Sequence, residues 1–147
     1  MQLQFRKATE ADILLYFEWT NDELTRQNSF SSELISFETH KNWFTNKINS
    51  KNNSFYLFLD EEQKCVGQVR IEILDTETVI GISVDKNFRG LGLASEMIRA
   101  ATTDFKFQHK SDIIAYIKPE NRASISSFLK VGFEKVISEN NKYLLKS

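Results

Sequence analysis

A glycine-spaced turn near the middle of the chain is the segment best suited to bind a ligand. It reads Val84-Asp-Lys-Asn-Phe-Arg-Gly-Leu-Gly-Leu-Ala94 and leads from an alternating apolar stretch into a helical one. Gly90 and Gly92 let the backbone approach a ligand closely. The unpaired N–H groups of a first helical turn and the helix dipole favour an anion there. Arg89 adds a fixed positive charge with two parallel donors, so the turn predicts a pyrophosphate site.

The two glycines are also compatible with a turn that binds nothing. Glycines at this spacing often form ordinary tight turns. No Gly-Lys-Ser/Thr triplet follows, as a Walker A loop would require, and the strands before the turn read as an antiparallel meander rather than a parallel βαβ unit. The two common nucleotide-binding loops are therefore excluded, and the simple turn stays as the alternative.

Hydrophobic spacing predicts the elements that position this turn. Before it we expect a strand over residues 2–6, a helix that begins at Thr9-Glu-Ala-Asp12 with Ile13, Leu14 and Phe17 at helical spacing, a helix capped by Ser36 with Phe44 and Ile48 four residues apart, and strands over residues 55–59, 66–74 and 78–84. After it we expect a helix with Leu93, Met97, Ile98 and Ala101 on one side, a strand over residues 112–117, a helix from Asn121 to Gly132, and a hairpin of residues 133–137 and 142–145 joined at Asn140-Asn141. This order indicates one α+β domain spanning residues 1–147.

The composition is that of a globular domain close to electrical neutrality. Its 147 residues include 19 basic and 20 acidic side chains dispersed along the chain, without the basic patch of a nucleic-acid-binding protein. The first residues lack the apolar core of a signal peptide, and no stretch approaches the roughly 18 apolar residues that span a bilayer. We therefore expect a cytoplasmic protein with no nucleic-acid and no membrane partner. Cys65 reads as a buried small hydrophobe, and two separated histidines with one cysteine predict no metal site.

The segment Arg89-Gly-Leu-Gly-Leu-Ala94 resembles the Arg/Gln-x-x-Gly-x-Gly/Ala signature by which the GNAT N-acetyltransferase family holds the pyrophosphate of coenzyme A. The order of elements is also similar, including Pro119-Glu-Asn121 and the pair Gly132-Phe133. The resemblance implies a mixed, mostly antiparallel sheet of about seven strands flanked by about four helices, with acetyl-CoA as the co-substrate. The implied cofactor-binding residues are Ile82, Ser83, Val84, Arg89, Gly90, Leu91, Gly92, Leu93, Ala94 and Asn121. Asn121 would look the same in sequence if it were only a helix cap.

The resemblance implies attack of a neutral amine on the thioester, which a base assists directly or through water. Glu72 alternates on one face with Gln68 and Arg70 and is a candidate catalytic residue, although a solvent-facing strand gives the same pattern. His40 is the second candidate because its unperturbed pKa suits proton transfer; a structural or substrate-binding histidine is the alternative. Phe128 stands where many members of the family carry a proton-donating tyrosine. Ser126, Ser127, Tyr143 or water would then protonate the thiolate.

The first third of the chain resembles the branch of that family that acetylates nucleotide-linked 4-amino sugars. The matching residues include Trp19-Thr-Asn-Asp22, Arg26, Ser29-Phe30, Ile35-Ser36, His40, Trp43-Phe44 and Gly67-Gln-Val-Arg70. Trp19, Trp43, Arg26 and Arg70 would stack on a ring and hold phosphate, whereas core packing also explains the tryptophans. The alternatives are an enzyme that acetylates protein N-termini, as ribosomal-protein acetyltransferases do, and a non-catalytic acyl-CoA sensor. The resemblance leaves a homodimer open.

Overall fold

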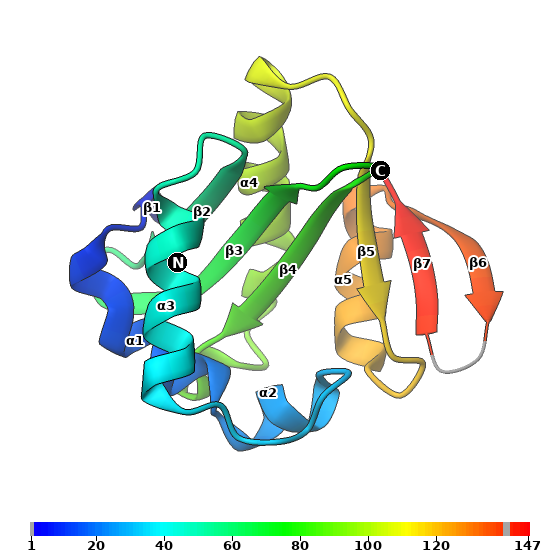
Figure 1. The fold of residues 1–147 in the computed structure, drawn as a ribbon. Helices are drawn as coiled ribbons and strands as arrows, with labels where there is room; N and C mark the ends of the chain where they lie inside the picture. The colour runs from blue at the N-terminus through cyan, green and yellow to red at the C-terminus, as the bar shows by residue number, and fades with distance from the viewer. Residues whose placement is uncertain (1, 140–141) are drawn as a thin grey trace.

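A single seven-stranded sheet organises the chain (Figure 1), and the computed structural model describes residues 2–139 and 142–147. The strands are β1 (Gln4–Lys7), β2 (Asn53–Leu59), β3 (Cys65–Ile73), β4 (Thr78–Val84), β5 (Ile113–Ile117), β6 (Glu134–Glu139) and β7 (Lys142–Lys146), in the spatial order β1-β2-β3-β4-β5-β7-β6. The pair β4–β5 is parallel, and the other neighbouring pairs are antiparallel. The mixed, mostly antiparallel sheet expected from the sequence is confirmed.

Helices cover both faces of this sheet, with α4 and α5 behind it and α1 and α3 in front in Figure 1. The helices are α1 (Ile13–Thr20), α2 (Glu23–Asn28), α3 (Phe37–Ile48), α4 (Leu93–Gln108) and α5 (Arg122–Val131), with short 3₁₀ turns η1 (Glu10–Asp12) and η2 (Lys86–Phe88). Hydrophobic spacing does not predict α2, because residues 21–29 read as a polar connection. This helix begins at Asp22, whose carboxylate accepts a hydrogen bond from the Thr25 backbone N–H at 3.1 Å.

The main core lies between the sheet and α4. This helix buries Leu93, Met97, Ile98 and Ala101, the four residues that helical spacing places on one side. Gly67 of β3 permits the close approach, since a Cβ there would lie 2.5 Å from the Ser83 carbonyl oxygen and 2.8 Å from Met97 Cε. The position of α4 fixes where its N-terminal turn meets the end of β4.

A second, aromatic cluster fills the space between the sheet and the helices α1 and α3. Its buried members are Tyr16, Trp19, Phe44, Phe55 and Leu57. The expected inward face of α1 is therefore wrong in part: Leu14 is 61% exposed, whereas Tyr16 and Trp19 are buried. The first turn of the expected helix is the 3₁₀ segment η1, which shifts the start of the α-helix and the residues it turns inward.

The strands β4 and β5 separate soon after they meet. Their pairing is limited to Thr78 with Ile113 and Val79 with Ile114. Beyond that point β5 pairs with β7 on its other side, and Figure 1 shows β4 and β5 diverging toward α2. The closing hairpin β6–β7 forms as expected, while the predicted turn at Asn140-Asn141 lies outside the described residues.

Replacing Phe44 tests the aromatic cluster. Phe44 is 0% exposed, so Phe44→Ala leaves a cavity and should lower the free energy of unfolding by about 3–5 kcal/mol. The control is Phe107→Ala, because Phe107 is 87% exposed and its truncation should change stability by less than about 0.5 kcal/mol. Urea denaturation measures both, and equal effects would contradict the packing described for α3.

Candidate active site

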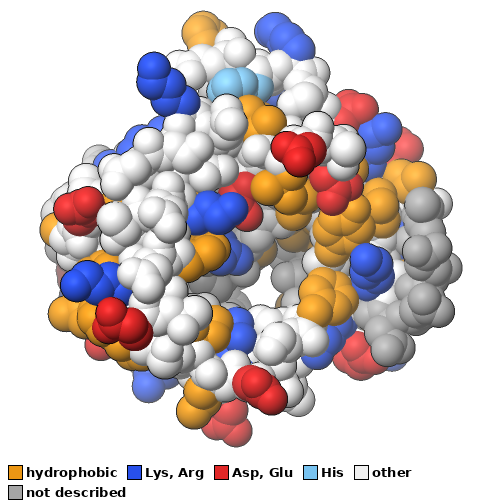
Figure 2. Space-filling model, in the orientation of Figure 1, with side chains coloured by type: hydrophobic (Ala, Val, Ile, Leu, Met, Phe, Trp, Pro, Cys, Tyr) orange, Lys and Arg blue, Asp and Glu red, His pale blue; other side chains and the backbone are white. Residues whose placement is uncertain are grey.

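A cavity of about 710 Å³ opens where β4 and β5 diverge. Figure 2 shows the molecule hollowed at this place. Side chains from α1, α2, α3, β3, β4, β5 and α5 line it, and the glycine turn before α4 forms one end. The Lys118 ammonium donates to the Gln27 carbonyl oxygen at 2.9 Å and joins the end of β5 to α2 across the opening. The cavity therefore brings together segments from both halves of the chain.

The glycine turn presents an open concave backbone to this cavity. Gly90 and Gly92 have φ angles of +79° and +75°, in the left-handed region that favours glycine. A Cβ on either residue would meet nothing within 4 Å, so the space beside them is free for a ligand. Among the described residues, no backbone hydrogen-bond acceptor takes the N–H groups of Gly92, Leu93 or Ala94. Such a turn at the N-terminus of a 16-residue helix fits a pyrophosphate group.

Arg89 lies beside this turn, but its guanidinium is engaged within the protein. Its Nε donates to the Val84 carbonyl oxygen at 3.0 Å, and its Nη2 contacts the Asp22 carboxylate at 2.6 Å. Burial alone would raise the pKa of Asp22, but the hydrogen bonds from Arg89 and Thr25 outweigh it and hold that pKa below its usual value. Arg89 therefore ties the end of β4 to the start of α2.

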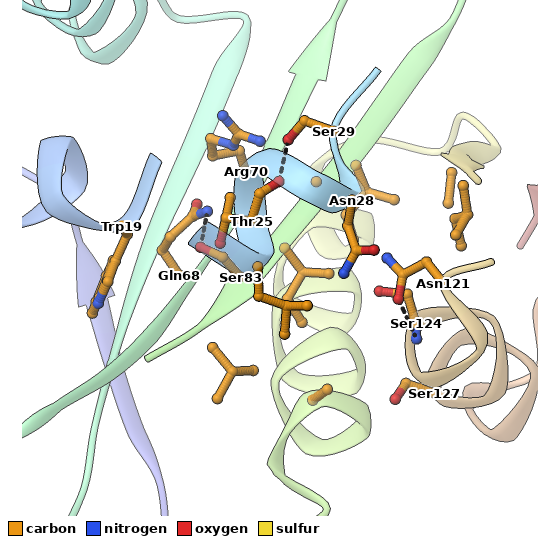
Figure 3. A pocket seen from close by; sticks show the side chains of 18 of the residues that line it. Trp19, Thr25, Asn28, Ser29, Gln68, Arg70, Ser83, Asn121, Ser124 and Ser127 are labelled. Carbon is orange, nitrogen blue, oxygen red and sulfur yellow. Dashed lines mark hydrogen bonds between the residues drawn. The ribbon is translucent and has the colours of Figure 1, made fainter. Parts of the chain in front are cut away.

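The strand before the turn offers an unpaired backbone edge. Beyond Val79, none of the described strands pairs with β4 on the β5 side, so the edge that includes Ile82 and the Val84 N–H has no strand partner there, while the Val84 carbonyl oxygen accepts from Arg89. An extended ligand with amide groups can pair with such an edge as an added strand would. The Ser83 hydroxyl accepts a hydrogen bond from the Gln68 side chain at 2.8 Å (Figure 3).

The polar face of β3 lines the cavity, as its alternation indicates. Gln68, Arg70 and Glu72 all belong to the lining. The Glu72 carboxylate lies 3.0 Å from the Lys47 ammonium of α3. Arg70 pairs in the sheet with Gly81 and lies over it, since a Cβ on Gly81 would be 2.7 Å from Arg70 Nη2. Trp43 stacks on the other side of Arg70, with its ring centroid 5.5 Å from the guanidinium carbon.

His40 also borders the cavity, but most of its ring is enclosed. It is 2% exposed, and its Nε2 lies 3.0 Å from the Ile13 carbonyl oxygen, which requires a proton on that nitrogen. Burial lowers the pKa of His40 below its usual value, which keeps the ring neutral at pH 7. The side chains of Phe17, Trp43 and Phe44 pack around it.

Trp19 and Arg26, two residues expected to bind the acceptor, border the cavity as well. Trp19 is 5% exposed, and its indole N–H donates to the Asp85 carboxylate at 2.8 Å. The Arg26 Nη1 donates to the carbonyl oxygens of Ser31 and Glu33, so it organises the loop after α2. The polar groups of these two side chains therefore hold the cavity wall.

The helix α5 supplies the far wall. The Asn121 side chain caps this helix by accepting from the Ser124 backbone N–H at 3.3 Å, and it points into the cavity opposite Asn28 (Figure 3). Phe128 is buried and also lines the cavity. Of the expected proton donors Ser126, Ser127 and Tyr143, Ser127 belongs to this lining, whereas the other two border a separate surface pocket.

Tyr116 and Gly81 are two of the cavity residues that are absent from those expected on sequence grounds. Tyr116 lines it and donates its hydroxyl to the Glu77 carboxylate at 2.6 Å, a hydrogen bond that raises the pKa of the phenol. The alternation of residues 113–117 places Tyr116 opposite the buried Ala115, so the sequence contains this signal. The sequence around Gly81 does not indicate a place in the cavity, because this glycine matters only by leaving room for Arg70, its partner on the neighbouring strand.

The described residues give no support to a metal site or to a reactive thiol. Within residues 2–139 and 142–147, no group of three or more His, Cys, Asp or Glu side chains could hold a metal ion. Cys65 is half-buried beside the aromatic cluster, and burial raises the pKa of its thiol. In this same part of the chain, no helix is long and apolar enough to cross a bilayer.

Known proteins share both the sequence pattern and the fold. Residues 2–134 match the family described as acetyltransferase (GNAT) domain. An uncharacterized N-acetyltransferase of Bacillus subtilis, YfmK, is 23% identical over 130 residues, covering 88% of this chain and 84% of that protein. A domain from Methanocaldococcus jannaschii superposes with a TM-score of 0.87 at 22% identity, covering 99% of this chain and 97% of the other. Spermidine N-acetyltransferase from Vibrio cholerae, solved with CoA and spermine, superposes with a TM-score of 0.83 at 15% identity. The match covers 99% of this chain and 93% of the other.

A glycine turn with room for a pyrophosphate, set beside an open strand edge, is the arrangement expected of a transferase that uses an acyl-CoA. The chain belongs to the GNAT acetyltransferase family, and it is an acetyl-CoA-dependent N-acetyltransferase. The family and co-substrate expected from the sequence are confirmed. The more specific branch that acts on nucleotide-linked amino sugars gains no support from these relatives.

The Arg89–Asp22 pair should make stability depend on pH. Because the pKa of Asp22 is lowered by folding, its contribution is complete above the unfolded value of about 4 and is lost as pH falls through the folded value. Asp22→Asn should lower the free energy of unfolding by roughly 1–2 kcal/mol at pH 7. The deficit should shrink below about pH 4. Asp75→Asn, at an exposed position, is the control in urea denaturation, and a deficit that persists at acidic pH would contradict this role of the pair.

Proposed function

We propose that this chain, as one domain over residues 1–147, transfers the acetyl group of acetyl-CoA to the primary amine of a small molecule bound in the cavity. The observation that carries this proposal is the alignment of two features along one strand. The open edge of β4 suits the pantetheine amides, and the glycine turn directly after it suits the pyrophosphate. A CoA molecule laid along them would bring its thioester to the cavity.

The cofactor contacts follow from this placement. Ile82 and Val84 would pair with the pantetheine amides through their backbone groups. The N–H groups of Gly92, Leu93 and Ala94 would bind the pyrophosphate. Arg89 would hold the turn in place through its contacts with Val84 and Asp22. The side-chain N–H₂ of Asn121 would donate a hydrogen bond to the pantetheine part of CoA.

The reaction forms one N–C bond and breaks one C–S bond. The neutral amine attacks the thioester carbonyl, the attacking nitrogen loses a proton, and the thiolate leaves and gains a proton. We assign the base to Glu72, directly or through water, because its carboxylate borders the cavity beside the polar face of β3. His40 is the weaker candidate, since its Nε2 already donates to Ile13 and its ring is enclosed. Ser127 or water would supply the final proton.

The acceptor belongs to the class of primary amines that such enzymes acetylate. The similar structures include a spermidine acetyltransferase and an aminoglycoside acetyltransferase, AAC(6')-Ib, which was solved with coenzyme A. A nucleotide-linked amino sugar is the acceptor that the front third of the sequence predicts, and an amine at a protein N-terminus is the competitor. Release of free thiol from acetyl-CoA in the presence of an amine would separate an enzyme from an acyl-CoA sensor, because a sensor binds CoA without turnover.

Gly92→Ala tests the position of the pyrophosphate. The new methyl group meets no protein atom but would occupy the space beside the bound anion, so the KM for acetyl-CoA should rise at least tenfold. Gly132→Ala is the matched control, because Gly132 also has a left-handed φ, +112°, with nothing within 4 Å of a Cβ, yet it lies at the C-terminus of α5. An equal rise in both variants would place the cofactor elsewhere.

Glu72→Gln tests the assignment of the base. Removing a general base should lower kcat by about a hundredfold while the KM for acetyl-CoA stays within a factor of about two. Glu38→Gln, on the exposed side of α3, controls for the loss of one negative charge. If kcat of the Glu72 variant stays within a factor of about three, the amine loses its proton to water without this carboxylate.

A further inference from the structure

The charges around the cavity are unevenly compensated. Among the described residues, Glu72 alone contributes a carboxylate to the lining, whereas three arginines, Arg26, Arg70 and Arg89, contribute guanidinium groups. The Glu72 charge is balanced by Lys47 at 3.0 Å, and the Arg89 charge by Asp22 at 2.6 Å. Arg26 and Arg70 have no such partner in the described part of the chain, so the cavity keeps a net positive charge.

These two uncompensated arginines differ in what they contact. The Arg26 guanidinium donates to the Ser31 and Glu33 carbonyl oxygens and to the Ser29 hydroxyl, so it holds a loop. The Arg70 side chain donates no hydrogen bond to any described residue, and its Nε is buried without a partner. A buried donor group left without an acceptor costs free energy, and an arginine stays charged at neutral pH. Arg70 therefore lacks a partner that a bound molecule can supply.

The surroundings hold Arg70 in position for such a partner. Gly81 leaves room for the guanidinium on the face of β4, where any Cβ would lie 2.7 Å from Nη2. The guanidinium also lies over the Trp43 ring, with 5.5 Å between the guanidinium carbon and the ring centroid. Gly81 lies within the open part of β4, which begins beyond Val79. The charge thus lies next to the strand along which the thioester is proposed to bind.

We propose that Arg70 binds an anionic group, a carboxylate or a phosphate, on the amine acceptor, so that this enzyme selects acceptors carrying both an amine and an anion. The proposal rests on the acetyltransferase function proposed above. A guanidinium with free donors matches either group with two parallel hydrogen bonds. The same positive field disfavours polyamines and aminoglycosides, which would bring several positive charges into a cavity with one carboxylate. Arg70 thereby becomes a specificity-determining residue.

Matched pairs of acceptors test this proposal with the unmodified protein. Each pair differs only in the anion: a panel of amino acids against their amides for the carboxylate, and glucosamine 6-phosphate against glucosamine for the phosphate. Thiol release should give a kcat/KM ten- to a hundredfold higher for the anionic member of at least one pair. The pair that shows this higher kcat/KM identifies the anion as a carboxylate or a phosphate. Equal rates within every pair, or a preference for spermidine, would overturn the proposal.

Substitution of Arg70 supplies the second readout. Arg70→Gln should abolish the preference within the responding pair by raising the KM for the anionic acceptor, while the KM for acetyl-CoA is unchanged. Arg70→Lys should retain part of the preference, because lysine keeps the positive charge but lacks the two parallel donors of the guanidinium. Arg99→Gln, at an exposed position of α4, is the control. A preference that survives Arg70→Gln would overturn the role of this residue. If calorimetry shows CoA binding but no amine of any kind releases thiol, the transferase function itself fails.

Discussion

The brief pairing of β4 with β5 is the constraint on which the rest of this structure depends. A strand normally satisfies its backbone groups on both sides, and unsatisfied groups carry a cost when they are buried. Here β4 and β5 share only two residue pairs, while β5 pairs with β7 on its opposite edge from Ile114 to Ile117, so β4 keeps one free edge. The helix α4 begins just beyond the end of that strand. The free edge of β4 and the N-terminal turn of α4 therefore both border the cavity.

The charge of the cavity depends on which of its charged side chains are paired with other side chains of the protein. Arg89 and Glu72 are each paired with a neighbouring side chain, and the polar groups of Trp19 and Arg26 hold the wall. Arg70 is treated differently, because the fold gives it space and a stacking ring but no acceptor. An arginine that donates no hydrogen bond within the protein can bind a ligand of opposite charge, whereas the side chains with protein partners serve mainly to hold the shape of the wall.

The sequence predicts those features that depend on local rules. The glycine turn, the strand before it and the helix after it are predictable because glycine, alternation and helical spacing each act within about ten residues. The same alternation places Gln68, Arg70 and Glu72 on one face, and the structure brings all three to the cavity. The family resemblance adds the mixed, mostly antiparallel sheet of about seven strands, which no local rule could supply.

What the sequence does not predict depends on contacts between distant segments. The pairing of Arg89 with Asp22 joins residues 67 positions apart, and the bond from Trp19 to Asp85 spans 66. Helix α2 escapes prediction because its six residues lack an apolar face, and its cap, Asp22, is equally typical of a loop. The inward position predicted for Leu14 is wrong because the 3₁₀ turn that changes the phase of α1 has no distinct sequence signal.

The glycine at position 81 of β4 determines how the Arg70 side chain of the neighbouring strand β3 can lie. Arg70 can lie across β4 because its cross-strand neighbour has no side chain, and even an alanine there would displace the guanidinium. The observed position of the Arg70 guanidinium therefore depends on the glycine at position 81. Position 81 thus influences where a positive charge lies in the cavity although its residue has no side chain.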